Sequence, residues 1–162
     1  MTHIFIDGGH GTTGLEIADR LANRPELSLI TLDDSKRKDM AARRTAINDA
    51  DIIILCLPDD AAREAVSLIE NDRTRVIDAS TAHRTANGWL YGFPEIVGRD
   101  AVAAAKRVSN PGCYATGFIA LLAPLVRAGL LPANWPYVCN AVSGYSGGGK
   151  AMIAEFEDQP AP

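Results

Sequence analysis

The run ADIIILCLP at residues 50–58 constrains the fold more than any other segment of this sequence. It is so apolar that, as a strand, it must be covered on both faces, and such strands belong to parallel sheets flanked by helices. Shorter apolar runs stand at residues 3–7 (HIFID), 27–32 (LSLITL) and 74–80 (TRVIDAS). Their length and their polar or glycine boundaries predict three further strands.

Two helical segments separate these strands. Residues 15–26 (LEIADRLANRPE) carry apolar residues at helical spacing, and Pro25 ends the predicted helix. Residues 59–71 (DDAAREAVSLIEN) predict a second helix with Asp59 or Asp60 as its N-cap. Strand–helix–strand order with short connections predicts an α/β fold, namely a Rossmann-like doubly wound parallel sheet.

The composition shifts near residue 110, where we place a domain boundary between residues 1–110 and 111–162. Just before it, a short helix is followed by a predicted strand at Arg107–Ser109. After it, residues 114–131 predict a long helix kinked at the proline within it. The segment PYVCNAVSG at residues 136–144 predicts a further strand.

Charge and hydropathy exclude several classes of protein. The formal charge of −4 argues against a nucleic-acid binder, which would carry a basic excess. The N-terminus enters the first predicted strand at once, without the basic region of a signal peptide. The apolar run Tyr114–Val126 has the length of a buried core helix rather than of a membrane span. We therefore expect a cytoplasmic protein that contacts neither membrane nor nucleic acid.

The three cysteines, Cys56, Cys113 and Cys139, show neither pairing nor metal-ligand spacing. Reduced thiols and the absence of a metal site are the simplest interpretation. Cys56 and Cys139 stand within predicted strands and are expected to be small apolar residues of the core.

The segment GGHGTTG, residues 8–14, follows the first predicted strand and opens the first predicted helix. It contains Gly9-x-Gly11-x-x-Gly14, preceded by Gly8. Such glycines let the backbone turn sharply and approach a pyrophosphate, which the helix N-terminus attracts. A tight turn without a ligand is the alternative. In this context the pattern predicts dinucleotide binding, with His10 near phosphate rather than catalytic.

The end of the second predicted strand bears on the choice of cofactor. Asp33 and Asp34 stand about where an acidic residue would bind the ribose 2′-hydroxyl of NAD. Ser35 and three cations follow at once, and Arg37 could hold the 2′-phosphate of NADP with two hydrogen bonds. A solvated charged turn is the alternative. The pattern favours NADP.

Cys113 follows Asn110-Pro111-Gly112 and precedes the long apolar helix. At a helix N-terminus unpaired N–H groups favour an anion, so the thiolate is stabilised there. Gly112 leaves room for a substrate carbonyl. We predict that Cys113 is a nucleophile; a buried structural thiol is the alternative. With a nicotinamide cofactor, such a thiol suits reduction of an acyl phosphate to an aldehyde through a thioester.

The sequence resembles N-acetyl-gamma-glutamyl-phosphate reductases of the shorter bacterial type, in the semialdehyde dehydrogenase superfamily. The motifs that carry the resemblance span nearly the whole chain, in the order GGHGTTG, CLPDDAA, VIDASTAHR, YGFPE, SNPGCYATG and VSGYSGGGK. Aspartate-semialdehyde dehydrogenases share the fold and the thiol, but their Asn-Cys motif is absent here. The resemblance implies NADPH-dependent reduction of N-acetyl-L-glutamyl 5-phosphate to N-acetyl-L-glutamate 5-semialdehyde and phosphate, in arginine biosynthesis.

The resemblance also assigns roles to individual residues. It implies Cys113 as nucleophile and Pro58 beside the nicotinamide half of the cofactor. The residues that it implies for the cofactor loop are Gly8, Gly11, Thr12, Thr13 and Gly14. Those that it implies near the substrate or its phosphate are Asn110, Arg84, Ser143, Gly144 and Lys150. Lys150 stands where the family often has arginine, which turns a two-pronged phosphate contact into a point charge. A surface role for Arg84 and a flexible glycine turn at residues 143–150 are the alternatives.

Members of the family have longer chains than this one and form oligomers, and they use a histidine of the second domain as acid–base catalyst. None of His3, His10 and His83 stands in a matching motif. We therefore expect residues 1–110 to be a dinucleotide-binding domain and residues 111–162 to be the truncated beginning of an α+β substrate (dimerisation) domain. A cofactor-binding module without chemistry and the same chemistry on an aminoadipate analogue remain alternatives. A dimer or tetramer is expected for the complete protein.

Overall fold

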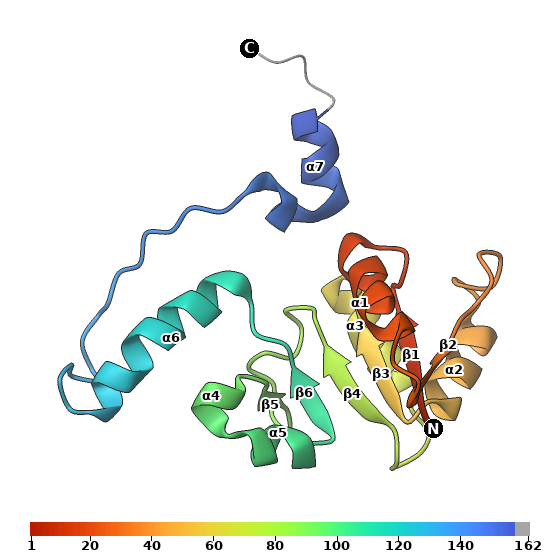
Figure 1. The fold of residues 1–162 in the computed structure, drawn as a ribbon, viewed down its shortest axis with the longest axis horizontal. Coiled ribbons are helices and arrows are strands. Elements are labelled where there is room, and N and C mark those ends of the chain that lie inside the picture. Colours follow the sequence, from red (N-terminus) through yellow and green to blue (C-terminus); the bar gives the residue numbers. More distant parts are fainter. Residues whose placement is uncertain (158–162) are drawn as a thin grey trace. The chain divides into compact units, whose positions relative to one another are not determined.

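The computed structural model describes residues 1–157, without the side chains of residues 150 and 151. Residues 2–109 contain a six-stranded, all-parallel sheet in the order β2-β1-β3-β4-β6-β5 (Figure 1). The strands are β1 (Thr2–Asp7), β2 (Leu27–Ile30), β3 (Ile52–Leu55), β4 (Arg75–Asp78), β5 (Leu90–Tyr91) and β6 (Arg107–Ser109). The predicted α/β class with a Rossmann-like sheet is confirmed.

Helices connect the parallel strands. The connections contain α1 (Thr12–Ala22), α2 (Met40–Asp49), α3 (Asp59–Ser67), α4 (Pro94–Val97) and α5 (Arg99–Ala104). The chain winds from β1 outward to β2, then back past β1 to β3. Because crossovers between parallel strands are right-handed, this reversal places α1 on one face of the sheet and α2 and α3 on the other. The reversal point lies between β1 and β3, where ligands of such sheets bind.

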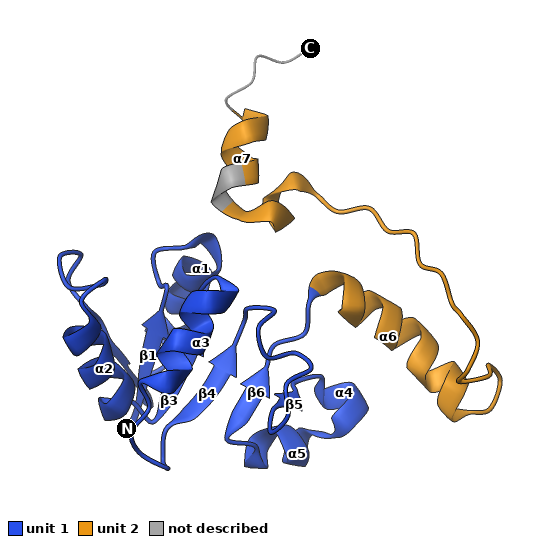
Figure 2. Cartoon of the chain, turned by 180° about the vertical axis from the view of Figure 1, so that it is seen from behind, with its two compact units in different colours: residues 1–112 blue, residues 113–162 orange. Residues whose placement is uncertain are grey.

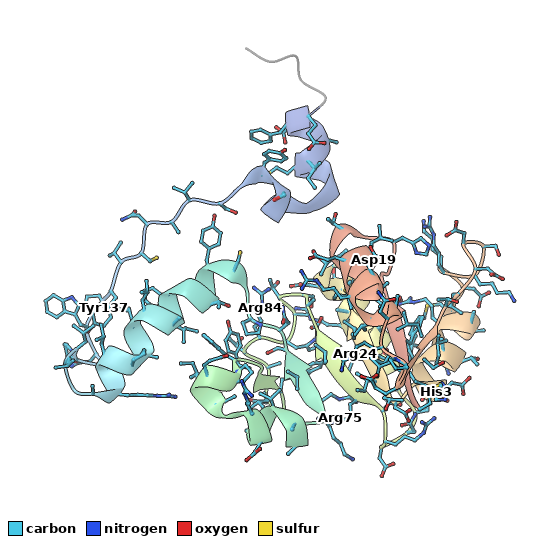
Figure 3. All side chains as sticks on the ribbon, in the orientation of Figure 1. His3, Asp19, Arg24, Arg75, Arg84 and Tyr137 are labelled. Atoms are coloured by element: carbon cyan, nitrogen blue, oxygen red, sulfur yellow. The ribbon has the colours of Figure 1, made fainter. Side chains whose placement is uncertain are left out.

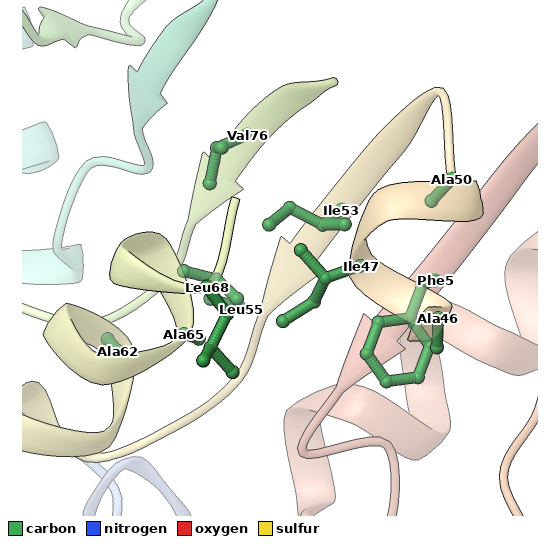
Figure 4. Close-up of a cluster of buried hydrophobic side chains, with 10 residues drawn as sticks. All are labelled: Phe5, Ala46, Ile47, Ala50, Ile53, Leu55, Ala62, Ala65, Leu68 and Val76. Atoms are coloured by element: carbon green, nitrogen blue, oxygen red, sulfur yellow. The ribbon is translucent and has the colours of Figure 1, made fainter. Parts of the chain in front are cut away.

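The hydrophobic core lies where α2 and α3 cover the sheet (Figure 4). Ile47 of α2 and Ile53 and Leu55 of β3 are fully buried. The other members of this cluster are Phe5, Ala46, Ala50, Ala62, Ala65, Leu68 and Val76. The small alanines of α2 and α3 let both helices approach the bulky strand residues closely. The covered β3 agrees with its apolar sequence.

Several elements escaped the sequence analysis or differ from it. Helix α2 forms within a polar stretch for which the sequence analysis predicted no helix or strand, and β5 and α4 were not predicted either. The N-cap of α3 is Pro58 instead of Asp59 or Asp60. Asp59 instead accepts hydrogen bonds from the backbone N–H and the hydroxyl of Thr81.

The second part of the chain corrects three expectations. Helix α6 (Cys113–Arg127) ends four residues before the expected position 131, and none of its residues is buried, so it is not a core helix here. The expected strand at residues 136–144 is absent, because this segment pairs with no strand of the described sheet. Cys139 within it is exposed rather than part of the core. A 3-10 helix (Tyr145–Gly148) and α7 (Gly149–Glu157) follow.

The chain divides into two compact units, Met1–Gly112 and Cys113–Pro162 (Figure 2). The division falls two residues after the boundary expected from composition. Over residues 1–157, no helix is both long enough and apolar enough to span a bilayer.

Candidate dinucleotide and thiol sites

The glycine loop joins β1 to α1 by a turn that only glycine permits. Gly8 has a φ of +87°, and its carbonyl accepts a hydrogen bond from the N–H of Gly11 at 3.0 Å. A Cβ placed on Gly8 would lie 2.2 Å from the carbonyl oxygen of Cys56, and one on Gly14 would lie 2.5 Å from that of Gly8. The loop therefore packs backbone against backbone, as a cradle for phosphate requires.

A pocket of about 680 Å³ opens beside this loop, at the carboxyl ends of β1, β2 and β3. This is the reversal point of the sheet, and the whole pocket lies within the first unit. Its wall includes Gly8, Gly9, His10 and Gly11 of the glycine loop, Thr31, Leu32, Arg37 and Lys38 of the segment between β2 and α2, and Cys56 and Leu57 after β3. Size and position suit the adenosine and pyrophosphate portion of a dinucleotide.

The structure brings only some of the predicted cofactor residues to this pocket. Gly8, Gly11 and Arg37 line it. Gly14 is buried behind the loop, while the exposed Thr12 and Thr13 begin α1. Ser35 and Pro58 are exposed and lie outside the pocket wall. Thr12, Thr13, Ser35 and Pro58 thus have no pocket contact to support their predicted role.

The positions of the two acidic residues after β2 do not support a role in binding ribose. Neither Asp33 nor Asp34 lines the pocket. The carboxylate of Asp34 lies 2.8 Å from Nε2 of His10 and 3.8 Å from Nη1 of Arg37. The neutral Thr31 and Leu32, which directly follow β2, line the pocket instead, and the two cations Arg37 and Lys38 come after them in the wall.

Arg43 of α2 forms a buried ion-pair network that the sequence analysis missed. Its Nη2 and Nε donate to Oδ2 of Asp7 at 2.9 and 3.2 Å, and its Nη1 donates to Oε2 of Glu64 at 2.8 Å. Burial disfavours the charged guanidinium, but the bonds to both carboxylates outweigh burial and raise the pKa of Arg43. All three residues line the pocket. No sequence signal distinguishes this arginine from its exposed neighbour Arg44.

Cys56 also lines the pocket, but its thiol has low reactivity. Burial, and after it the negative charges of Asp7 and Asp78, raise the pKa of Cys56 to about 11. A thiol held in the protonated form is a poor nucleophile. Cys56 was expected to be a core residue, and it is only partly buried.

A second buried cluster stands at the carboxyl end of β4. Asp78, fully buried, accepts hydrogen bonds from the backbone N–H and the hydroxyl of Ser80 at 2.9 and 2.8 Å. Its Oδ2 lies 2.6 Å from Nδ1 of His83, whose ring stacks on Trp89 at 4.1 Å. These contacts fold the loop between β4 and β5 back over the strand end. The partners of His83 could not be identified from the sequence.

Arg84, the next residue of this loop, lies against the end of the first unit (Figure 3). A Cβ on Gly112 would lie 2.6 Å from Nη1 of Arg84, so the guanidinium packs on the backbone that immediately precedes Cys113. Nε of Arg84 is buried and has no partner among the described residues. Asn110, which follows β6, donates its backbone N–H to the carbonyl of Asp78 at 2.7 Å. Two predicted substrate residues therefore lie near residue 112.

The second unit holds the predicted nucleophile. Cys113 is the first residue of α6 and is exposed. Ser143 and Gly144 are exposed and directly precede the 3-10 helix, with the Ser143 hydroxyl donating to the Gly144 carbonyl at 3.1 Å. Lys150 belongs to α7, but its side chain lies outside the described part of the chain. Among residues 1–157, no group of His, Cys, Asp or Glu side chains could hold a metal ion.

A parallel sheet with a glycine loop and a pocket at its reversal point is the architecture of α/β proteins that bind dinucleotides. Comparison with protein families agrees with this class. Residues 3–105 match the family model "Semialdehyde dehydrogenase, NAD binding domain", and residues 113–160 match "Semialdehyde dehydrogenase, dimerisation domain". The chain belongs to the semialdehyde dehydrogenase family.

Individual relatives show which members of the family this chain is similar to. The chain is 61% identical over 156 residues to the N-acetyl-gamma-glutamyl-phosphate reductase of Chelativorans sp., covering 95% of this chain and 50% of the relative. It is 58% identical over 160 residues to the enzyme of that name from Burkholderia ambifaria, covering 98% of this chain and 51% of the relative. The chain thus spans about half the length of the curated relatives that it matches. The resemblance seen in the motifs is confirmed.

Solved structures of the family support the fold alone. Aspartate semialdehyde dehydrogenase from Francisella tularensis superposes with a TM-score of 0.68 at 14% identity, covering 96% of this chain and 48% of that one. Aspartate semialdehyde dehydrogenase II from Vibrio cholerae gives a TM-score of 0.64 at 18% identity, covering 96% of this chain and 50% of that one.

Proposed function

We propose that this chain is the N-terminal part of an NADPH-dependent N-acetyl-gamma-glutamyl-phosphate reductase. The reaction converts N-acetyl-L-glutamyl 5-phosphate to N-acetyl-L-glutamate 5-semialdehyde and phosphate. The observation that carries the proposal is the identity of about 60% to relatives with that name along almost the whole chain. The glycine-loop pocket and the exposed thiol at the start of α6 supply the two chemical elements of such a reaction.

In this reaction Cys113 forms and breaks the covalent bond to substrate. Its thiolate attacks the acyl carbon, and the carbon–oxygen bond to phosphate breaks with its electron pair on the phosphate. NADPH, when bound, supplies the hydride that reduces the resulting thioester. Hydride addition leaves the acyl oxygen as an alkoxide on the thiohemiacetal carbon. The carbon–oxygen double bond then re-forms, and the carbon–sulfur bond breaks with its electron pair on the sulfur of Cys113, which releases the aldehyde and the thiolate. Cys113 is exposed at the first position of α6, so its sulfur is accessible to a substrate.

The glycine cradle would hold the cofactor phosphates. Side chains at Gly8 and Gly14 would collide with backbone, so the loop offers its own N–H groups to an anion instead. Thr12 and Thr13 add hydroxyls at the start of α1. Pro58, at the N-cap of α3, is proposed beside the nicotinamide half.

We infer a preference for NADP from the charges of the pocket wall. Arg37 and Lys38 line it after β2, while the two acidic wall residues, Asp7 and Glu64, are both bonded to Arg43. Cations near the ribose attract a 2′-phosphate, and Arg37 can give it two hydrogen bonds. Ser35, in the same turn, is proposed to add a hydroxyl.

Five residues are proposed to bind substrate or its phosphate. They are Arg84, Asn110, Ser143, Gly144 and Lys150. The packing of the Arg84 guanidinium on Gly112 supports this role, because it brings a positive charge next to the segment that carries Cys113. A homo-oligomer is proposed for the complete protein from the match of residues 113–160 to a dimerisation domain.

The complete protein, extended beyond residue 162, tests the reaction in the reverse direction. Reduction of NADP is measured with N-acetylglutamate semialdehyde and with the aminoadipate homologue, each with and without phosphate. Phosphate-dependent reduction with the first substrate, lost in Cys113→Ser, is expected. A preference for the homologue would show that the natural substrate is the aminoadipate analogue, which is one carbon longer. Cofactor binding with an unreactive Cys113 and no turnover would leave only a binding module.

A further inference from the structure

The buried side chain of Arg43 connects two loops that line the same pocket. Asp7, its first partner, is the last residue of β1 and directly precedes Gly8 of the glycine loop. Arg43 itself stands one turn into α2, the helix that follows the loop bearing Arg37 and Lys38. The guanidinium thus bonds the beginning of one loop to the helix at the end of the other.

The cationic loop is coupled tightly to α2. Asp39, the N-cap of α2, accepts a hydrogen bond from the N–H of Ala42 at 2.8 Å, and its carbonyl accepts one from the N–H of Arg43 at 3.0 Å. The N–H of Asp39 in turn donates to the carbonyl of Lys36 at 2.9 Å. A shift of the first turn of α2 would therefore move Arg37 and Lys38 as well.

Glu64 of α3 holds the same guanidinium from a second direction. Its Oε2 accepts from Nη1 of Arg43 at 2.8 Å, while the guanidinium side chain is 8% exposed and that of Asp7 is 6% exposed. A fork of donors fixed by two carboxylates, one of them fully within the protein, has little rotational freedom. Arg43 is thereby fixed relative to both β1 and α3.

We propose that Arg43 is a positioning residue that sets the separation between the glycine loop and the cationic loop, and thereby the preference for NADP over NAD. This inference rests on the proposed cofactor role of the pocket. In NADP the pyrophosphate and the 2′-phosphate are separated by one adenosine, so two anion sites at a fixed separation favour it. NAD lacks the 2′-phosphate, so its affinity is insensitive to the position of Arg37 and Lys38.

Binding of NADP and NAD to the 162-residue chain, measured by titration calorimetry, tests this role without turnover. Arg43→Met alone would leave Asp7 buried without its partner and endanger folding. The double variant Asp7→Asn/Arg43→Met removes both buried charges instead. We expect the ratio of NADP to NAD affinity to fall about tenfold, since charge-assisted contacts to one phosphate are lost. Contacts that the two cofactors share cancel in this ratio.

Arg44→Met is the matched control. Arg44 is the next residue of α2 and is half exposed. Its Nη1 lies 2.7 Å from Oε1 of Glu70, and neither residue lines the pocket. This substitution should leave the affinity ratio unchanged. Glu64→Gln is the milder second variant, because Glu64 is half exposed and its loss leaves the bond to Asp7 in place. It should lower the ratio in the same direction by a smaller factor.

The outcomes separate this inference from the proposed function. If the double variant folds and its ratio of NADP to NAD affinity is unchanged, the positioning role of Arg43 is overturned, whether or not both affinities fall. If the double variant does not fold, by circular dichroism, an unchanged ratio in Glu64→Gln overturns the role equally. An unsubstituted chain that binds neither dinucleotide would overturn the proposed function itself.

Discussion

Asp78 and His83 form a buried pair at the carboxyl end of β4, with 2.6 Å between Oδ2 and Nδ1. Asp78 also accepts two hydrogen bonds from Ser80, so the carboxylate is fully engaged within its own loop. The same loop contains Arg84, whose guanidinium packs against Gly112. A local contact between residues five positions apart thus fixes a cation beside the segment that leads to the proposed nucleophile.

Replacing His83 with Ala should destabilise the first unit. The change removes one partner of a buried carboxylate and the stacking contact with Trp89, so the free energy of unfolding should fall by about 2–3 kcal/mol. Urea denaturation followed by circular dichroism measures this value. His3→Ala is the control, because His3 is exposed and its loss should cost at most about 0.5 kcal/mol. Equal effects of the two substitutions would contradict a structural role for the pair.

Gly14→Ala should damage the cofactor loop. Its Cβ would lie 2.5 Å from the carbonyl oxygen of Gly8, so the loop or the first turn of α1 must shift, at a cost of about 1–3 kcal/mol. Thermal unfolding and dinucleotide titration should both detect the change. Gly117→Ala is the matched control within a helix, since a Cβ there meets nothing within 4 Å. That variant should keep full binding, and an unaffected Gly14→Ala would show that the loop has space to spare.

The three thiols should differ in their reaction with iodoacetamide. Cys113 and Cys139 are both exposed, but only Cys113 stands at a helix N-terminus, so it should react several-fold faster near pH 7. Cys56 should react much more slowly than the two exposed thiols below about pH 11, because its pKa is raised to about 11. Mass spectrometry of tryptic peptides resolves the rates. Equal rates for Cys113 and Cys139 would refute activation by the helix.

The raised pKa of Cys56 also predicts a loss of stability in base. The folded state retains the thiol proton up to about pH 11, whereas the unfolded chain releases it near 9.0. The unfolded state therefore binds fewer protons between these values, and stability falls as the pH rises through this window. Unfolding midpoints at pH 8, 9, 10 and about 11 should show a steeper decline for the unsubstituted chain than for Cys56→Ala. Parallel curves would assign the decline to other groups.

Five of the six strands and the glycine loop were predictable because their signals are local. The strands are short apolar runs, and the loop needs glycines at fixed spacing, so both can be recognised without knowledge of distant contacts. Helix α2 was missed for the opposite reason. Part of its buried face is Arg43, which looks like a surface residue until its two carboxylate partners, 36 and 21 positions away, are known.

The residues after Cys113 show a second limit of sequence analysis. Residues 136–144 have the composition of a strand, but a strand requires a neighbour for its backbone hydrogen bonds, and the described chain offers none. The apolar residues of α6 likewise have the pattern of a core helix without being buried. Composition predicts what a segment can pair with or pack against, but not whether that partner is present.

The close approach of Gly8 to the main chain of Cys56 makes the two positions unequal in their tolerance to substitution. Every amino acid at position 56 presents the same carbonyl oxygen, so no replacement there relieves the 2.2 Å collision that a side chain at position 8 would meet. Position 56 is free to drift among residues that fit the pocket, while position 8 is not. The backbone conformation of the glycine loop therefore depends on glycine at position 8 and not on which side chain stands at position 56.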